Sequence, residues 1–324
     1  MTGSAEKRLE TEMRAEGEVE RREGIEFRSA GAKDAEGIAE LYKKAYDGHY
    51  PLREYFEPGW IVNAIKKQSY IWQIAVNKNK VVGSSVGVPC NWNKSFEIGR
   101  TIITDNFYNR KIAKTLCERV RSEGFTQGFE IGWGTIRNEV MYNISKYLFM
   151  PVVGYLPGMH KPKVRETHLF CMRPSPIAKE KRRVPKQCPL YQSSTVKEIT
   201  KELALDSIIS DYPPDVVVGP NSDYAVLLKL SYHGGDNSTI INSIDNFDKL
   251  AAEYLQVTLL ADKTDAIKFF SRLGFELCAF LPAWFEGDGK RYDCVTMASC
   301  GVKAVLPEKM FLSTVNKFKK IQLK

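Results

Sequence analysis

Residues 97–123 read EIGRTIITDNFYNRKIAKTLCERVRSE, and this stretch decides the fold expected for the chain. Residues 97–104 are β-branched and mostly apolar, which predicts a buried strand. Residues 105–109 carry turn chemistry. An apolar residue then recurs at every fourth position over residues 112–120, which predicts one apolar face of a helix that ends at Gly124. The stretch is therefore expected to form a strand, a loop and a helix.

The beginning of this helix is predicted to bind an anion. The first backbone N–H groups of a helix have no acceptor within the helix, and together with the helix dipole they favour negative charge. Arg110, Lys111 and Lys114 lie at this helix start, where cations oppose the dipole. We therefore favour an anionic ligand such as a pyrophosphate over a merely solvated helix start.

The same stretch resembles the coenzyme-binding core of the GNAT superfamily of acetyl-CoA-dependent N-acyltransferases. After the strand, the family pattern is Gln/Arg-x-x-Gly-x-Gly/Ala. In the matching window, Ala113 fits, whereas Tyr108 replaces the Gln/Arg and Lys111 replaces the middle Gly. The positions that the resemblance assigns to the coenzyme are Ile102, Ile103, Thr104, Tyr108, Asn109, Arg110, Lys111, Ile112, Ala113, Lys114 and Asn138. Among them, the backbone N–H groups of Ile103 and Thr104 would polarise the thioester carbonyl.

The composition is that of a globular protein. The chain has 324 residues, of which 43% are hydrophobic and 27% charged, so two domains are expected. The net charge of +8 suits a polyanionic ligand such as coenzyme A, an acidic carrier protein or a nucleic acid, and does not choose among them.

The seven cysteines are scattered and odd in number, which argues against a zinc site or a disulfide framework and for a reducing cytoplasm. No apolar run has transmembrane length, and the N-terminus lacks a signal-peptide core.

Residues 25–172 are expected to form a GNAT-like domain. The predicted elements are a strand over 25–30, a helix over 33–46, strands over 70–76 and 80–89 around a turn at 77–79, and, after the helix that ends at Gly124, a parallel strand over 129–136, a helix over 138–148 and strands over 149–155 and 168–172. The resemblance covers about residues 25–160. It implies an α/β (α+β) fold with a mixed, mostly antiparallel sheet flanked by helices.

Three residues are candidates for acid–base chemistry. In the family's second motif, an Asn is followed seven residues later by a Tyr that protonates the departing thiolate. Asn138 fits the first position, but Ser145 stands where the Tyr should be, so Tyr142 and Tyr147 are substitute acids. Glu97, at the strand start, is the candidate base and would act through water. The alternative for Glu97 is a surface carboxylate at the end of a strand.

The segment 46–65 is unusually aromatic. Its aromatic and histidine residues are Tyr46, His49, Tyr50, Tyr55, Phe56 and Trp60. The resemblance implies that this region helps to form the acceptor pocket. A hydrophobic core is the alternative, and the sequence leaves both open.

Two segments are expected to lie outside folded domains. Residues 1–24 are almost all polar and are expected to be a disordered leader. Residues 173–189 are basic and punctuated by prolines, which is typical of a linker. Because this segment lacks interleaved aromatics, a solvated linker is favoured over a nucleic-acid contact.

Residues 190–324 are expected to form a second, degenerate GNAT-like unit. Strands are predicted over 224–231, 257–262, 274–282 and 291–298, and helices over 246–254, 264–273 and 308–320. The strand–helix order echoes the first domain, and Gly274-Phe275 matches the family's second motif. No phosphate loop opens a helix here. This unit is therefore expected not to bind coenzyme A and to complete the sheet or the acceptor cleft.

The resemblance implies a cytoplasmic N-acetyltransferase or acyltransferase of the GNAT type. The enzyme would transfer an acyl group, acetyl in the simplest case, directly from acyl-CoA to a small-molecule or protein amine, with no metal and no membrane partner. One alternative is a catalytically inactive GNAT-fold regulatory or scaffold protein, which Tyr108, Lys111 and the missing Tyr favour. The other is an acyltransferase whose donor is an acyl carrier protein, because Arg110, Lys111 and Lys114 would meet its acidic surface.

Overall fold

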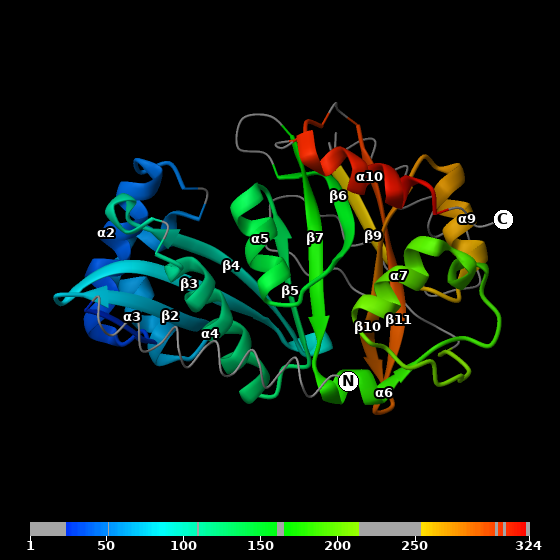
Figure 1. Ribbon diagram of the computed structural model, residues 1–324, viewed down its shortest axis with the longest axis horizontal. Helices are drawn as coiled ribbons and strands as arrows, with labels where there is room; N and C mark the ends of the chain where they lie inside the picture. Colours follow the sequence, from blue (N-terminus) through cyan, green and yellow to red (C-terminus); the bar gives the residue numbers. More distant parts are fainter. Residues whose placement is uncertain are drawn as a thin grey trace. The chain divides into compact units, whose positions relative to one another are not determined.

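The computed structural model describes residues 24–50, 52–108, 110–160, 165–213, 254–301, 304–306 and 309–321. The chain divides into two compact units (Figure 1). Unit 1 comprises Met1–Pro89 and Ile98–Gly124, and unit 2 comprises Cys90–Glu97 and Phe125–Lys324. The sequence analysis expected domain boundaries after residues 24, 172 and 189. The limits of the two compact units do not coincide with these positions, and the expected domain boundaries stay a prediction.

Unit 1 contains the first four strands of the chain. Its elements are β1 (Ile25–Ser29), η1 (Ala32–Asp34), α2 (Ala35–Tyr46), η2 (Arg53–Phe56), α3 (Pro58–Lys66), β2 (Ile71–Asn77), β3 (Lys80–Cys90), β4 (Ser95–Ile103), η4 (Asp105–Phe107) and α4 (Ile112–Thr126). The C-terminal ends of β3 and α4 and the first residues of β4 belong to unit 2. The strand order is β1-β2-β3-β4, with β2 antiparallel to both β1 and β3. The turn predicted at 77–79 is confirmed, since Lys78 and Asn79 adopt φ angles of 47° and 65° between β2 and β3.

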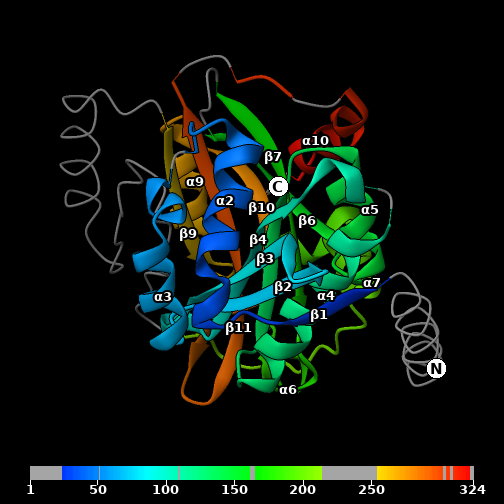
Figure 2. The ribbon, with the colours of Figure 1, turned by 90° about the vertical axis from the view of Figure 1, so that its left-hand side faces the viewer.

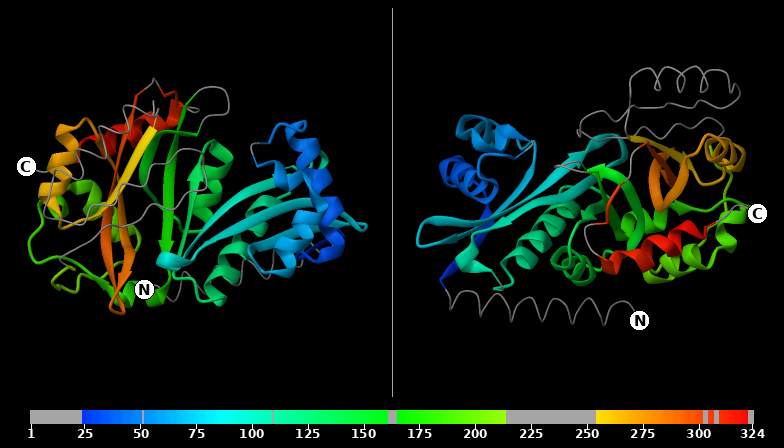
Figure 3. Two further views of the ribbon diagram at one scale, coloured as in Figure 1. Left: turned by 180° about the vertical axis from the view of Figure 1, so that it is seen from behind. Right: turned by 90° about the horizontal axis from the view of Figure 1, so that it is seen from above.

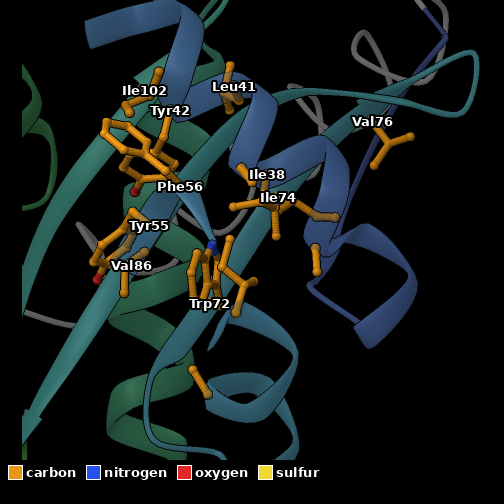
Figure 4. Packing of buried hydrophobic residues seen from close by; sticks show 14 residues of the cluster. Ile38, Leu41, Tyr42, Tyr55, Phe56, Trp72, Ile74, Val76, Val86 and Ile102 are labelled. Carbon is orange, nitrogen blue, oxygen red and sulfur yellow. The ribbon is translucent and has the colours of Figure 1, made fainter. Parts of the chain in front are cut away.

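The strands of unit 1 are covered on both faces. Alternate residues of β2, from Trp72 through Ile74 to Val76, pack with α2 and α3 in one hydrophobic cluster (Figures 2 and 4). Ala75, on the opposite face, packs in a second cluster with Ile112 of α4. The period of two along a strand produces this division, because successive side chains point to opposite faces.

The helix α4 is longer than the sequence indicates. Gly124 is a buried helical residue, and α4 continues to Thr126. The left-handed residue beyond the helix is Gly128, with φ of 90°, and its N–H donates to the Phe125 carbonyl at 3.1 Å. The prediction that Gly124 ends the helix is therefore wrong, and the glycine four residues later stands in the terminating conformation.

Unit 2 contains the remaining strands (Figure 3). Its elements are η3 (Asn91–Asn93), β5 (Ile131–Ile136), α5 (Glu139–Tyr147), β6 (Val152–His160), β7 (Glu166–Pro174), α6 (Pro176–Lys181), β8 (Arg182–Arg183), η5 (Pro189–Gln192), α7 (Ser194–Glu202), β9 (Tyr254–Leu260), α9 (Thr264–Arg272), β10 (Glu276–Gly287), β11 (Lys290–Cys300), η6 (Lys309–Phe311) and α10 (Leu312–Lys319). From the first residues of β4, the strand order runs β4-β5-β7-β6-β10-β11-β8, and β9 pairs with β11. The strands β4 and β5 are parallel, as predicted, with Ser95 opposite Ile131 and Glu97 opposite Trp133. The expected strand at 224–231 lies outside the described residues, as does the expected helix at 246–254 except for Tyr254, which is the first residue of β9.

Most strands in the described part of unit 2 belong to two repeats of strand, helix and hairpin. The first repeat is β5-α5-β6-β7, and β7 pairs antiparallel with both β5 and β6. The second is β9-α9-β10-β11, and β11 pairs antiparallel with both β9 and β10. The two repeats join where Gly154 of β6 faces Ala279 of β10. The echo seen in the sequence is therefore a repeat of topology.

The two hairpins match in detail. The β6–β7 register shifts between Val152 and Gly154 and again between Leu156 and His160. The β10–β11 register shifts between 277 and 279 and again between 281 and 285, which are the corresponding positions. At the second shift, an arginine donates to the carbonyl of a left-handed residue in each hairpin: Arg165 to Gly158 at 3.1 Å and Arg291 to Ala283 at 3.1 Å.

Residues 173–189 are not the solvated linker that was expected. Ser175 caps α6 by accepting from the Ala178 N–H at 3.1 Å, and β8 follows. Arg182 is fully buried and donates two hydrogen bonds, at 2.8 and 2.5 Å, to the carboxylate of Asp293, which is also fully buried. A basic residue in this segment is thus committed to a core ion pair, which the local composition does not reveal.

A second buried ion pair lies in the same unit. Arg291 is fully buried and donates from Nε to Oε2 of Glu130 at 2.6 Å, while Lys181 donates to Oε1 of Glu130 at 2.6 Å. Burial raises the pKa of Glu130, but the two cations outweigh it and hold the pKa below the usual value of 4.5.

Within the described ranges, no helix is long and apolar enough to span a bilayer.

Candidate functional site

The strand that leads to the predicted coenzyme loop has a distorted backbone at its centre. Arg100, in the middle of β4, adopts a φ angle of 53°, which is uncommon for a residue with a side chain. Its carbonyl accepts a hydrogen bond of 2.8 Å from the hydroxyl of Tyr42, a fully buried residue of α2. Strain of this kind persists only where the surroundings enforce it, and it clusters at functional sites. Neither residue was singled out from the sequence, and only the adjoining Gly99 hints at the distortion.

In the loop between β4 and α4, the residue at the middle Gly position of the pattern has a left-handed backbone. Lys111 stands at the position of the middle Gly and adopts a φ angle of 59°, the left-handed conformation that glycine takes most easily. Its carbonyl accepts from the Thr115 N–H at 3.0 Å, so α4 begins directly after it. Asn109 lies outside the described residues.

Cationic side chains gather at this helix start. Arg110 and Lys111 are exposed and Lys114 is half-buried. The Arg110 guanidinium lies 5.1 Å from the centre of the Phe107 ring, so the ring orients it at the loop. Tyr108, at the Gln/Arg position of the pattern, is 58% exposed. With the N–H groups of the first turn of α4, these residues form an electropositive surface suited to phosphate.

The apolar residues of the predicted coenzyme set are core residues. Ile103 and Ile112 are buried in one hydrophobic cluster, against which Ala113 packs, and Ile102 is buried in the other. They can therefore offer a ligand only their main chains. The N–H of Thr104 donates to the Val82 carbonyl at 2.9 Å. The expectation that this N–H polarises a thioester carbonyl is wrong, because the neighbouring strand already accepts its hydrogen bond.

Four of the predicted site residues lie in unit 2, and three of them belong to the region of α5. Asn138 is the N-cap of α5 and accepts from the Met141 N–H at 2.9 Å, as a capping Asn does. Tyr142 is half-buried, with the ammonium of Lys146 lying 4.2 Å from the centre of its ring. Tyr147, near the end of α5, is also half-buried. Asn138, Tyr142 and Tyr147 are all at least partly exposed, so a ligand could contact them. Their chemical roles stay predictions.

Glu97 is the fourth of these residues and is buried. It is 8% exposed and is the third residue of β4, opposite Trp133. The alternative of a surface carboxylate at a strand end is therefore wrong. A buried carboxylate in a strand costs desolvation energy, which makes a functional or structural partner necessary.

The aromatic segment after α2 is mostly core. Tyr55 and Phe56 are buried, and the Tyr55 ring lies 4.8 Å from that of Tyr42. The cluster reaches the surface at Tyr46, which is 37% exposed and stacks on Tyr50 with ring centres 4.3 Å apart. The core alternative thus accounts for most of the segment. His49 itself is exposed.

The described residues contain no group of three or more His, Cys, Asp or Glu residues that could hold a metal ion. Six of the seven cysteines are buried, and Cys300 is half-buried. In unit 1 the structure brings together the described loop residues from Ile102 to Lys114, whereas Glu97, Asn138, Tyr142 and Tyr147 belong to unit 2.

No protein-family model and no curated protein matches this chain. Its similarity is to solved structures. The ribosomal-protein-S5-alanine acetyltransferase from Vibrio fischeri is 15% identical, with 47% of this chain and 94% of that chain covered and a TM-score of 0.42. A GNAT superfamily phosphinothricin acetyltransferase from Sinorhizobium meliloti, in complex with acetyl-CoA, is 15% identical, with 47% and 88% covered and a TM-score of 0.40.

A third structure is the PaiA N-acetyltransferase from Thermoplasma acidophilum in complex with coenzyme A. It is 16% identical, with 47% of this chain and 99% of that chain covered and a TM-score of 0.36. These neighbours are GNAT acetyltransferases, the superfamily whose motifs the sequence resembles, and the matched part is about half of the chain.

Proposed function

We propose that this protein is an acyl-CoA-dependent N-acyltransferase of the GNAT type that uses acetyl-CoA and transfers the acyl group to a small-molecule or protein amine. One observation carries the proposal. Lys111 occupies the Gly position of the coenzyme motif with a left-handed φ of 59° at the start of α4. Glycine adopts this conformation most easily, so the φ of Lys111 supports the alignment of this loop with the motif.

The basic residues would compensate for the missing glycine. A lysine at the middle position prevents the bare main-chain approach that glycine permits, but it adds an ammonium group for phosphate. The exposed Arg110 and the half-buried Lys114 extend the positive surface along the start of α4. Phosphate binding here would combine main-chain N–H groups, the helix dipole and charge-assisted hydrogen bonds.

The proposal also names candidates for the acid and the base. An alkyl ammonium acceptor has a pKa of about 10.4 and must lose a proton before it attacks the thioester. Glu97 would accept that proton through water, and Tyr142 or Tyr147 would protonate the departing thiolate.

Two alternatives each rest on a specific observation. Ser145 stands at the usual position of the acid Tyr, is buried, and donates to the Tyr142 carbonyl at 2.8 Å, which favours an inactive regulatory or scaffold protein. Arg110 and Lys111 are exposed, which favours an acidic acyl carrier protein as the donor.

The test is calorimetric titration of acetyl-CoA into the full-length protein, with charge and backbone separated by substitution. Lys111→Glu reverses the charge, whereas Lys111→Gly removes the ammonium group and keeps the left-handed backbone. Lys78 supplies the matched control, because it is an exposed lysine of unit 1 with a φ of 47°. We expect Lys111→Glu to weaken binding at least about tenfold, as the loss of a charge-assisted hydrogen bond implies. Lys78→Glu should leave the affinity unchanged.

The outcomes distinguish the three functions. Binding that Lys111→Glu weakens and Lys78→Glu does not would place coenzyme A on this loop, and an acceptor screen would follow. A wild-type protein that ignores acetyl-CoA but binds an acyl-loaded carrier protein would support the carrier donor. A protein that binds neither would contradict an acyltransferase function.

A further inference from the structure

A cavity of about 700 Å³ lies in the second repeat of unit 2. It is lined by α9, the beginning of β10 and the end of α10, and by Tyr155 of β6. Its volume falls within the range of about 300–1,000 Å³ that is usual for small-molecule sites. None of the residues that line it belongs to the β4–α4 loop, so it is a separate site from the one proposed for coenzyme A.

Part of the cavity lining is apolar. Ile267, Phe275 and Ile321 are buried, with 1%, 4% and 6% of their surfaces exposed, and the half-buried Leu277 lies beside them. These residues come from α9, β10 and the segment after α10. A ligand with an apolar body would bury its surface against them.

The charged groups of the cavity are mostly cations. Its single carboxylate is Glu276, whose Oε2 accepts from the Tyr155 hydroxyl at 2.9 Å and lies 3.4 Å from the Lys319 ammonium. Lys319 thus balances Glu276, and the cations that remain are Lys268 and Arg272. The net charge of the lining is positive.

Lys268 and Arg272 lie four residues apart on α9, so their like charges share one face of the helix. Both side chains are exposed, and within the described residues neither forms an ion pair. Like charges at this spacing destabilise a helix slightly. An anion bound between them would remove that repulsion and accept charge-assisted hydrogen bonds from both.

One polar group of the lining, the Tyr155 hydroxyl, belongs to a core residue. Tyr155 is 1% exposed, and its hydroxyl reaches Glu276 across the junction of the two repeats. Tyr155, Glu276 and Lys319 also line a second cavity of about 340 Å³. This trio therefore forms the wall that the two cavities share.

We propose that the larger cavity binds a small amphipathic anion, with a carboxylate or phosphate head between Lys268 and Arg272 and an apolar body against Ile267, Phe275 and Ile321. Both head groups offer the oxygen acceptors that an arginine and a lysine recognise. The burial of Tyr155 and its hydrogen bond to Glu276 fix another part of the lining. The proposal does not depend on the function proposed above.

The test is calorimetric titration of the full-length protein with four probes below their micelle-forming concentrations. Decanoate and decyl phosphate carry an anionic head on an apolar chain and distinguish the two head groups. Decyltrimethylammonium has the same chain and the opposite charge, and inorganic phosphate has a head without a chain. We expect at least one anionic amphiphile to bind, and the other two probes to bind at least about tenfold more weakly.

Substitutions locate the site. The double variant Lys268→Glu/Arg272→Glu should weaken binding of the anionic amphiphile at least about tenfold, and Ser271→Trp should fill the cavity. The matched control is Lys197→Glu/Lys201→Glu, which reverses two exposed charges at the same four-residue spacing on α7.

Three results would overturn the proposal: no binding of either anionic amphiphile, equal binding of the cationic amphiphile, or equal weakening by the α7 control. Lys111→Glu should leave binding of the amphiphile unchanged. Failure of acetyl-CoA binding with retained amphiphile binding would therefore contradict the proposed enzyme and leave this site standing.

Discussion

Gly154 of β6 and Ala279 of β10 face each other at the point where the two repeats of unit 2 join. A Cβ atom added to Gly154 would overlap the Cβ of Ala279 and lie 2.5 Å from its Cα. The same interval of 125 residues separates Gly154 from Ala279 and the left-handed Gly158 from the left-handed Ala283. Equivalent positions of the two repeats thus meet. Because the Cys278 carbonyl oxygen also lies 2.5 Å from the added Cβ, the close approach of the strands requires residue 154 to lack a side chain.

Gly154→Ala is expected to destabilise unit 2 by about 1–3 kcal/mol, because the added methyl group forces the two strands apart. The swapped pair Gly154→Ala/Ala279→Gly places one methyl group at the junction again and should recover part of the loss. Urea unfolding of the two single variants and the double variant measures this coupling.

The control for this cycle is Gly59→Ala in α3, where nothing lies within 4 Å of the added Cβ. Its unfolding free energy should stay the same or rise, since alanine favours the helix. Additive effects of the substitutions at 154 and 279 would show that the two strands do not press on each other.

Arg182→Met is expected to cost unit 2 about 3–5 kcal/mol, since it leaves the buried Asp293 carboxylate without its guanidinium partner. Asp293 would keep the hydroxyl of Tyr191 and the N–H of Ala283 as donors, which do not neutralise its charge. Chemical unfolding measures the loss. The neighbouring Arg183 is half-buried and donates to main-chain carbonyls, so Arg183→Met should cost about 1 kcal/mol or less. Equal costs at the two positions would argue against a core role for Arg182.

Asp34 makes the stability of unit 1 dependent on pH. Two hydrogen bonds from Arg28, at 2.7 and 2.8 Å, hold the pKa of Asp34 below its usual value of 3.8, although burial acts in the opposite direction. A carboxyl group whose pKa is lower in the folded state stabilises the fold above its unfolded pKa. This contribution is lost as the pH falls through the folded-state pKa.

Asp34→Asn should therefore lower the unfolding free energy by about 1–3 kcal/mol at pH 7, and the difference from wild type should shrink as the pH falls below about 3.8. Urea unfolding, followed by the fluorescence of Trp60 and Trp72, measures it. Glu36→Gln, at an exposed position of α2, is the control and should show no such pH-dependent difference. A constant gap between Asp34→Asn and wild type across this range would contradict the assignment.

Tyr42→Phe removes the hydroxyl that donates to the Arg100 carbonyl in β4. We expect a loss of about 1–2 kcal/mol, because the carbonyl loses a buried donor. Should the β4–α4 loop bind acetyl-CoA, the same variant should also weaken its binding, since the bond fixes the strand that leads into the loop. Tyr46→Phe, at the exposed end of the aromatic cluster, should change stability by about 0.5 kcal/mol or less. Calorimetry measures acetyl-CoA binding by both variants, and urea unfolding measures their stability. Equal effects of the two substitutions would contradict the role of the Tyr42 hydroxyl in fixing β4.

Most local elements were predictable from periodicity. The strand, loop and helix over residues 97–123 form β4, η4 and α4, and α9 occupies residues 264–272 within the predicted range of 264–273. Apolar residues at every second or every third to fourth position report which face of an element is buried, and this information is contained in the local sequence. The end of α4 was missed because Gly124 is tolerated inside a packed helix, whereas Gly128 takes the left-handed conformation.

The candidate site was only partly predictable. The motif window singled out Lys111, and its left-handed φ was seen only in the structure. The strained Arg100 and its donor Tyr42 were not found, because they are 58 residues apart in the sequence and no local pattern joins them. Likewise, the hydrogen bond from Thr104 to Val82 depends on the pairing of two strands.

The sequence by itself determined the kinds and the order of most elements and the basic loop at the start of α4. The tertiary structure decided which basic residue enters the core, where two repeats meet, and which backbone positions are left-handed. Local periodicity encodes burial within one element. The partner of Arg182 is 111 residues away, and that of Gly154 is chosen by strand pairing, so both follow only from the packing of the whole unit.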